Sequence, residues 1–311
     1  MQRHSPSRTA DQRKASFILM PVLAAGLMLS CRDNRQDTRG VGLEPPEMPE
    51  VPITLPKRVD SEYRSGFVLG CPDWMVHVYN EPHDYCIDRF EAHLVENRGG
   101  VETVHPSSMR PAPLGRYIAK SLPGVRPQSS VNRKMAEDAC VNAGKRLCTI
   151  REWIRACAGV ENYTYPYGNI ETPRICNTRK PHLLSALHGA NPKKWGDGMN
   201  DPLLNMVRGF LAKTGEYSGC VSSYGTFDQV GNLHEWVSDL VDDKIIASRP
   251  RIGPASKSNG FKAVPGNGIF MGGFYGTAGE NGSGCNYMTI VHGPNQDDYS
   301  IGFRCCKDTN K

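Results

Sequence analysis

The pattern of apolar and polar positions changes character along the chain. Residues 17–29 form an apolar run of 13 residues, which is too short to span a bilayer as a helix. Residues 132–143 and 149–158 carry apolar side chains every three to four positions, which predicts two helices with one buried face each. After Gly159 the chain is rich in Gly, Asn and Pro. Short strands are expected there at residues 233–237, 269–272 and 302–306.

Both predicted helices carry local start signals. Asn132 can cap the first helix, and Gly144 can end it. The second helix opens with a capping box formed by Thr149 and Glu152. Two short strands are expected before the helices, at residues 76–79 and 85–90. Two early helices followed by irregular antiparallel structure predict an α+β fold.

The first thirty residues predict a targeting segment. Arg13 and Lys14 precede the apolar run, which ends in the sequence Met28-Leu-Ser-Cys31. A small residue directly before a cysteine resembles a bacterial lipobox, so residues 1–30 are interpreted as a lipoprotein signal peptide and Cys31 as the lipidation site. Acyl chains on Cys31 would hold the protein at a membrane without a transmembrane span. An ordinary secretory signal is the alternative.

Two further segments follow the predicted leader. Residues 31–65 contain many prolines and charged residues with little to bury, which predicts an extended tether. The folded domain is expected over residues 66–308. With 32 glycines and 23 prolines in 311 residues, this domain is expected to be rich in loops.

The charge of the chain excludes one class of partner. The formal net charge is +5, and residues 1–30 contribute four Lys or Arg against one Asp. The remaining positive charges are scattered without runs, so no nucleic-acid-binding surface is expected.

Cysteine usage fits an exported protein. Besides Cys31 the chain has ten cysteines, and an even number in an exported chain favours disulfides. Zinc is the alternative, but no Cys-x-x-Cys pair or neighbouring histidine pair supplies the ligand spacing. The sequence by itself leaves the pairing of the cysteines open.

An ordered series of motifs runs along the chain from residue 144 to residue 306: Gly144–Leu147, Glu152-Trp153, Tyr165–Asn169, Asp228–Trp236, Gly272-Gly273 and Gly302–Cys306. This series resembles the formylglycine-generating (sulfatase-modifying factor) family. The resemblance implies a C-type-lectin-like α+β fold with long loops that disulfides hold in place. It also implies the pairs Cys140–Cys305 and Cys157–Cys285, and the remaining cysteines then suggest Cys71–Cys86, Cys148–Cys306 and Cys176–Cys220.

The resemblance stops at the family's reactive thiols. Active members of the family place two copper-binding cysteines five residues apart just after the Gly-Gly pair, but residues 274–284 here contain no cysteine. Phe274 stands where the enzymes commonly have Ser, and Met288 stands where they have Arg. Phe274, Tyr275, Thr277 and Met288 are therefore interpreted as a vestigial pocket, and copper binding is not expected. Cysteines introduced at Thr277 and Gly282 would restore the spacing.

Calcium is the metal that the resemblance favours. Family members hold structural Ca²⁺ near the loop that corresponds to residues 228–235, where Asp228, Val230, Asn232 and Glu235 offer hard oxygen donors. The alternative is that these residues only close a tight turn. His234, in the same motif, is expected to be a surface or locally hydrogen-bonded residue. Trp195 is expected either to cover the core from a long loop or to contact a partner.

Together these observations predict a membrane-anchored lipoprotein of the bacterial envelope whose domain binds or scaffolds, with envelope proteins or glycans as partners. The alternative is a metal-dependent oxidoreductase of the formylglycine-generating and non-haem iron enzyme superfamily. The sequence leaves the oligomeric state open. The missing cysteine pair argues against catalysis without deciding the question.

Overall fold

The computed structural model describes residues 70–80, 83–113, 115–188, 198–249, 262–277 and 281–309. The predicted leader, the tether, Cys31 and Trp195 lie outside these ranges. The strands are β1 (Met75–Asn80), β2 (His83–Asp88), β3 (Ala92–Arg98), β4 (Val101–Val104), β5 (Tyr117–Ser121), β6 (Arg146–Leu147), β7 (His234–Leu240), β8 (Gly268–Met271), β9 (Met288–Thr289), β10 (Ile301–Phe303) and β11 (Cys305–Asp308). The helices are α2 (Arg133–Asn142), α3 (Ile150–Ala158), α4 (Leu183–His188) and α6 (Asp243–Ser248), with 3₁₀ turns η2 (Leu204–Met206) and η3 (Gly284–Asn286).

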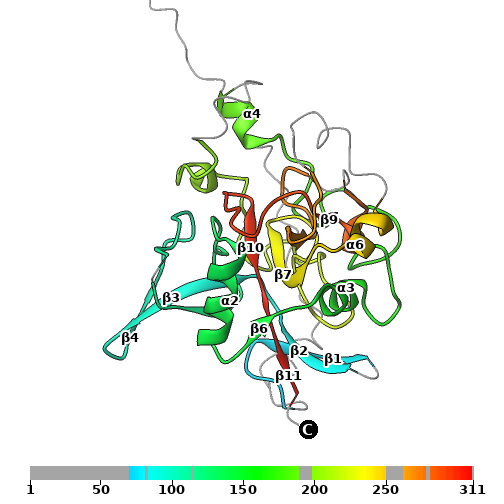
Figure 1. The fold of residues 1–311 in the computed structure, drawn as a ribbon, viewed down its shortest axis with the longest axis horizontal. Helices are drawn as coiled ribbons and strands as arrows, with labels where there is room; N and C mark the ends of the chain where they lie inside the picture. Colours follow the sequence, from blue (N-terminus) through cyan, green and yellow to red (C-terminus); the bar gives the residue numbers. More distant parts are fainter. Residues whose placement is uncertain are drawn as a thin grey trace, which may run out of the picture. The chain divides into compact units, whose positions relative to one another are not determined.

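Within the described residues the strands form three sheets, with the orders β1-β2-β11-β6, β10-β7-β8-β9 and β4-β3-β5. Figure 1 shows β10 and β11 as one red path that passes from beside β7 to the sheet of β1 and β2. The expectation of antiparallel structure in the second half is wrong at one point, because β10 pairs with β7 in parallel. The C-terminal residues thus join two of the three sheets.

The two predicted helices form as expected. The Asn132 side chain accepts a hydrogen bond from the backbone N–H of Met135 at the start of α2. Thr149 and Glu152 make both hydrogen bonds of a capping box at the start of α3. Trp153 lies on the buried face of α3 and is fully buried in the core.

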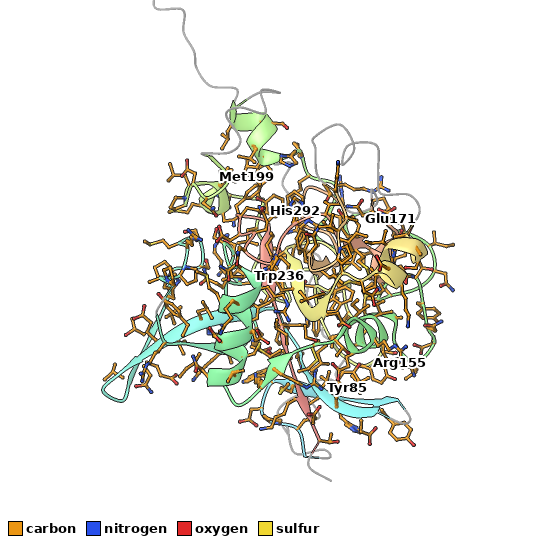
Figure 2. All side chains as sticks on the ribbon, viewed as in Figure 1. Tyr85, Arg155, Glu171, Met199, Trp236 and His292 are labelled. Atoms are coloured by element: carbon orange, nitrogen blue, oxygen red, sulfur yellow. A yellow bond between two sulfur atoms is a disulfide. The ribbon has the colours of Figure 1, made fainter. Side chains whose placement is uncertain are left out.

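The core contains two tryptophans that belong to different hydrophobic clusters. Trp153 packs in a cluster with Val237, Ile269 and Met271, whereas Trp236 packs with residues of α2, β3 and β10. Figure 2 shows Trp236 surrounded by densely packed side chains. Because Trp236 and Val237 are adjacent on β7, that strand presents one side chain to each cluster and holds them together.

Five disulfides tie the loops to this core: Cys71–Cys86, Cys140–Cys305, Cys148–Cys306, Cys157–Cys285 and Cys176–Cys220. These are the same pairs that the family resemblance and the remaining cysteines suggest. Cys305 and Cys306 are neighbours on β11 and bond to α2 and to the residue after β6, respectively. In the part of the chain that the structure describes, no helix is long and apolar enough to cross a membrane.

Candidate functional site

The candidate site begins where β8 ends. Gly272 and Gly273 both have positive φ angles, +84° and +75°. A Cβ atom on Gly272 would lie 2.4 Å from the carbonyl oxygen of Gln229, so only glycine lets the chain pass this close to the loop before β7. Phe274 and Thr277 then exchange two backbone hydrogen bonds of 3.1 Å. These contacts fix the turn that carries the predicted vestigial pocket.

The Phe274 ring fills the interior of this turn. Phe274 is only 4% exposed. Its ring centroid lies 5.1–5.9 Å from those of Tyr275, His234, His182 and Tyr299. The phenyl ring therefore packs as an ordinary core residue among aromatic neighbours.

Of the other two predicted pocket residues, Thr277 borders this turn, whereas Met288 lies in a different hydrophobic cluster. Thr277 is half-buried, and its hydroxyl lies 3.3 Å from the hydroxyl of Tyr287. Met288 is buried on β9, paired with Met271, in the hydrophobic cluster that contains Trp153. The structure therefore brings Phe274 and Tyr275 together and assigns Met288 to a different part of the core.

No thiol is available at the site in the described part of the chain, because all ten cysteines there form disulfides. Restoring a cysteine at Gly282 also meets a steric obstacle. Gly282 has a φ angle of +124°, and its Cβ would lie 2.6 Å from the carbonyl oxygen of Asn286. A side chain there would strain the backbone, so the cysteine pair at Thr277 and Gly282 does not fit this turn.

His234 is buried rather than at the surface, which corrects the expectation from the sequence. His234 is the first residue of β7 and is 6% exposed. The centroid of its ring lies 4.8 Å from that of Phe270 and 5.5 Å from that of Tyr287. Burial and the nearby His292 lower the pKa of His234 to about 3, so the imidazole is neutral at physiological pH. Its Nδ1 atom has no hydrogen-bond partner among the described residues. A neutral imidazole is tolerated inside this aromatic cluster because it carries no charge.

A second buried group in the core consists of charged side chains. Arg304, fully buried between β10 and β11, donates to both carboxylate oxygens of Glu235 at 2.6 and 2.7 Å. The indole of Trp153 donates to the same carboxylate at 2.6 Å. Arg304 also donates to backbone carbonyls of Asp88 and Phe227. One guanidinium therefore joins β2, β7 and the loop before β7.

Two more carboxylates lie close to this ion pair. Glu91 accepts hydrogen bonds from the Asn232 side chain at 2.6 Å and from the Leu233 backbone at 3.1 Å. Asp228 accepts one from the backbone of Gly215 at 2.7 Å. Burial raises the pKa of Glu91, and the charges of Asp228 and Glu235 raise it further. The group contains three carboxyl groups and one guanidinium, so its net charge depends on how many of the carboxyl groups are protonated at a given pH.

The predicted calcium ligands belong to this group. The Glu235 carboxylate is bound by Arg304 and Trp153, and the Asn232 amide oxygen accepts from the Asn177 side chain and the Ala212 backbone. A calcium ion held by all four residues would have to displace these donors. The set as a whole does not fit the ion, and a calcium requirement stays a prediction from the sequence.

Replacing Asp228 with Asn should make the fold more stable at high pH. Burial raises the pKa of Asp228 to about 7, against the opposing effects of the Gly215 hydrogen bond and Arg304. The folded state therefore holds the proton more tightly than the unfolded state, and Asp228 lowers stability progressively as the pH rises towards 7. Asn keeps the acceptor for Gly215 and tolerates the φ angle of +61°. We expect a gain of about 1–3 kcal/mol at pH 8 and a clearly smaller gain at pH 4.5, which is close to the pKa of Asp in the unfolded chain.

Urea unfolding at these two pH values measures this effect. Asp228→Ala is the control, because it removes both the charge and the acceptor and should destabilise the fold at pH 4.5. An Asp228→Asn variant that is equally destabilised at both pH values would show that the carboxylate is ionised and needed.

The sequence of the chain matches one known protein family. The sequence profile of the Sulfatase-modifying factor enzyme 1-like domain matches residues 75–309. The chain belongs to this family. Its α+β, loop-rich and disulfide-stapled domain is therefore the formylglycine-generating-enzyme fold. Among curated proteins, no sequence matches the chain significantly.

Solved structures resemble the sulfatase-modifying-factor domain at low sequence identity. PvdO from Pseudomonas aeruginosa is 16% identical, with 72% of this chain and 80% of that chain covered and a TM-score of 0.42. CarF is 15% identical, with 73% and 87% covered and a TM-score of 0.39. Treponema denticola variable protein 1 is 13% identical, with 75% and 98% covered and a TM-score of 0.37. The likeness concerns the fold alone.

Two residues of the charged group, Arg304 and Glu91, are not among the site residues that the sequence predicts. Arg304 lies within the Gly302–Cys306 motif, where an arginine in an otherwise apolar strand segment indicates a buried ion pair. Glu91 directly follows the second predicted strand, and no neighbouring residue in the sequence indicates which group it binds. Its contacts come from Asn232 and Leu233, more than 140 residues away.

Proposed function

We propose that this chain is a non-catalytic member of the sulfatase-modifying-factor family that binds or scaffolds partners in the bacterial envelope, held at a membrane by acyl chains on Cys31. The leader, the lipobox-like Met28–Cys31 and the Pro-rich tether support the anchor. Five disulfides support a location outside the reducing cytosol.

One observation carries the non-catalytic part of the proposal. At the turn where the resemblance places the family's redox cysteines, the buried Phe274 ring packs against two histidines and two tyrosines. Copper(I) needs soft thiolate ligands, and neither a phenyl ring nor the Thr277 hydroxyl supplies one. The buried Met288 removes a further polar contact, since an apolar thioether cannot grip an anionic or polar substrate.

The first test of this proposal is chemical. The purified chain should leave a sulfatase-type Cys-x-Pro-x-Arg peptide unmodified when copper, oxygen and a reductant are supplied, because no thiolate pair holds the metal. Mass spectrometry reads the conversion of the cysteine to formylglycine, and an active formylglycine-generating enzyme run in parallel is the positive control. Conversion of the peptide by this chain would contradict the proposal.

The membrane anchor and the partners need separate measurements. Metabolic labelling with a radioactive fatty acid should mark the unaltered chain and leave a Cys31→Ser variant unlabelled. A pull-down from native membranes, followed by protein and glycan mass spectrometry, identifies what the domain binds. Recovery of the chain alone from such membranes would speak against a scaffolding role.

A further inference from the structure

Arg249 carries a positive charge to the turn at residues 281–288. It caps the C-terminal end of α6, where its backbone N–H donates to the carbonyl oxygen of Ile246 at 3.1 Å. From there its side chain reaches the turn, and Nη1 donates to the carbonyl oxygen of Asn286 at 2.8 Å. Arg249 thus brings a cationic side chain into contact with this turn, in which Met288 is apolar and buried.

The Arg249 guanidinium is partly desolvated and poorly satisfied. Its side chain is half-buried, and burial lowers its pKa, although the group stays protonated. Among the described residues it forms no ion pair and donates to no acceptor other than the Asn286 carbonyl. Arg146 and Arg304, which are also partly or fully buried, each bind a carboxylate. The Arg249 guanidinium therefore loses part of its hydration, and no carboxylate among the described residues compensates for that loss.

The turn is shaped to let Arg249 approach closely. Gly282 has no side chain, and a Cβ there would lie 3.2 Å from Nη1 of Arg249 and 2.6 Å from the Asn286 carbonyl oxygen. The neighbouring Asn281 side-chain amide makes only long hydrogen bonds, 3.4 Å to Tyr287 and 3.3 Å to Thr289. The turn thus combines a cation with a weakly held amide donor.

We propose that Arg249 is the point where this domain binds a carboxylate group of its partner, such as an acidic side chain or a chain terminus. Nη1 is engaged by Asn286, and among the described residues no acceptor engages the edge formed by Nε and Nη2. This edge presents two parallel N–H groups, the number and geometry that one planar carboxylate accepts. The inference names a ligand chemistry for the proposed binding function and rests on that function.

The test uses the whole chain in detergent, labelled with ¹⁵N-arginine. The Nε–Hε signal of Arg249 is assigned by its loss in the Arg249→Gln variant. Sodium acetate replaces sodium chloride at constant ionic strength, with sodium sulfate and sodium phosphate as parallel titrations. We expect acetate to shift the Arg249 signal in a saturable way, while the signal of the exposed Arg208, assigned by Arg208→Gln, moves little and linearly.

Three results would overturn the inference. The first is an Arg249 signal that moves no more than that of Arg208. The second is sulfate or phosphate binding at least tenfold tighter than acetate, which would assign a tetrahedral anion instead. The third is acetate binding by a Glu280→Gln variant but not by the unaltered chain, which would mean that Glu280 neutralises Arg249. The formylglycine assay does not depend on Arg249, so it can fail or succeed independently.

A variant also tests the role of the turn. Gly282→Ala should weaken acetate binding severalfold, because the added methyl group meets the Asn286 carbonyl and displaces the turn from Arg249. Gly266, which has a positive φ angle but no neighbour within 4 Å of its Cβ position, is the matched control as Gly266→Ala. Equal acetate affinity in both variants and the unaltered chain would contradict the proposed geometry.

Discussion

Replacing Arg304 with Met is expected to lower the free energy of unfolding by about 3–5 kcal/mol, since it breaks a buried ion pair by removing one partner. Glu235 would keep only the Trp153 indole as a side-chain donor, inside a core where its carboxylate has no access to water. Glu91 and Asp228 would lose the cation that lowers their pKa values. Three carboxylates would then share the site with no cation in direct contact with Glu235.

Urea denaturation at pH 7 measures this loss, with the exposed Arg208→Met as the control for removing a positive charge. If Arg304→Met does not fold at pH 7, unfolding at pH 5 keeps the test possible, because protonated carboxylates need the arginine less. The double variant Arg304→Met with Glu235→Gln should recover part of the stability. A loss below 1 kcal/mol for Arg304→Met alone would show that the ion pair barely offsets its desolvation.

The second large effect is expected at the neighbouring disulfides Cys140–Cys305 and Cys148–Cys306, which span 165 and 158 positions. Either bond alone keeps the same long loop closed, so both must be removed to free it. Replacing all four cysteines with Ala should cost about 4 kcal/mol or more, because the unfolded chain then loses that restriction. The bond Cys71–Cys86 spans 15 positions, and its removal should cost about 3 kcal/mol. Urea unfolding without reductant compares the quadruple variant with the Cys71 and Cys86 double variant. A larger loss for the short loop would contradict this account.

The helices could be predicted from the sequence because their determinants are local. Asn132 and the Thr149–Glu152 capping box act within four residues, and the apolar stripe on each helix identifies its buried face. The strand near residues 233–237 was also predicted, although β7 extends to Leu240. Local patterns of this kind do not depend on which element lies opposite in the fold.

The direction of the strands and their pairing in sheets could not be predicted from such local patterns. The parallel pairing of β10 with β7 depends on the path that the chain takes between residues 240 and 301, and no local pattern encodes it. The sheet of β3, β4 and β5 was missed as well. All four positions of β4 are exposed, so that strand lacks the alternation that marks a half-buried one.

The site shows the same limit at the level of single side chains. The missing cysteines and the bulk of Phe274 are visible in the sequence, because they concern residue identity alone. Burial of His234 depends on Phe270, Phe274 and Tyr287, which come from other segments. The engagement of Glu235 by Arg304 likewise depends on a contact across 69 residues.

The positions of the cysteines determine how late in synthesis the long-range disulfides can form. Cys140, Cys148 and Cys157 find their partners at Cys305, Cys306 and Cys285, so a ribosome must finish nearly the whole chain before any of these bonds can close. Until then, three half-cystines on α2, α3 and the segment between them are open to exchange with one another or with foreign thiols. A chain truncated just before Cys305 would leave Cys140 and Cys148 without their partners. We expect such a product to form mixed disulfides rather than a shorter native domain.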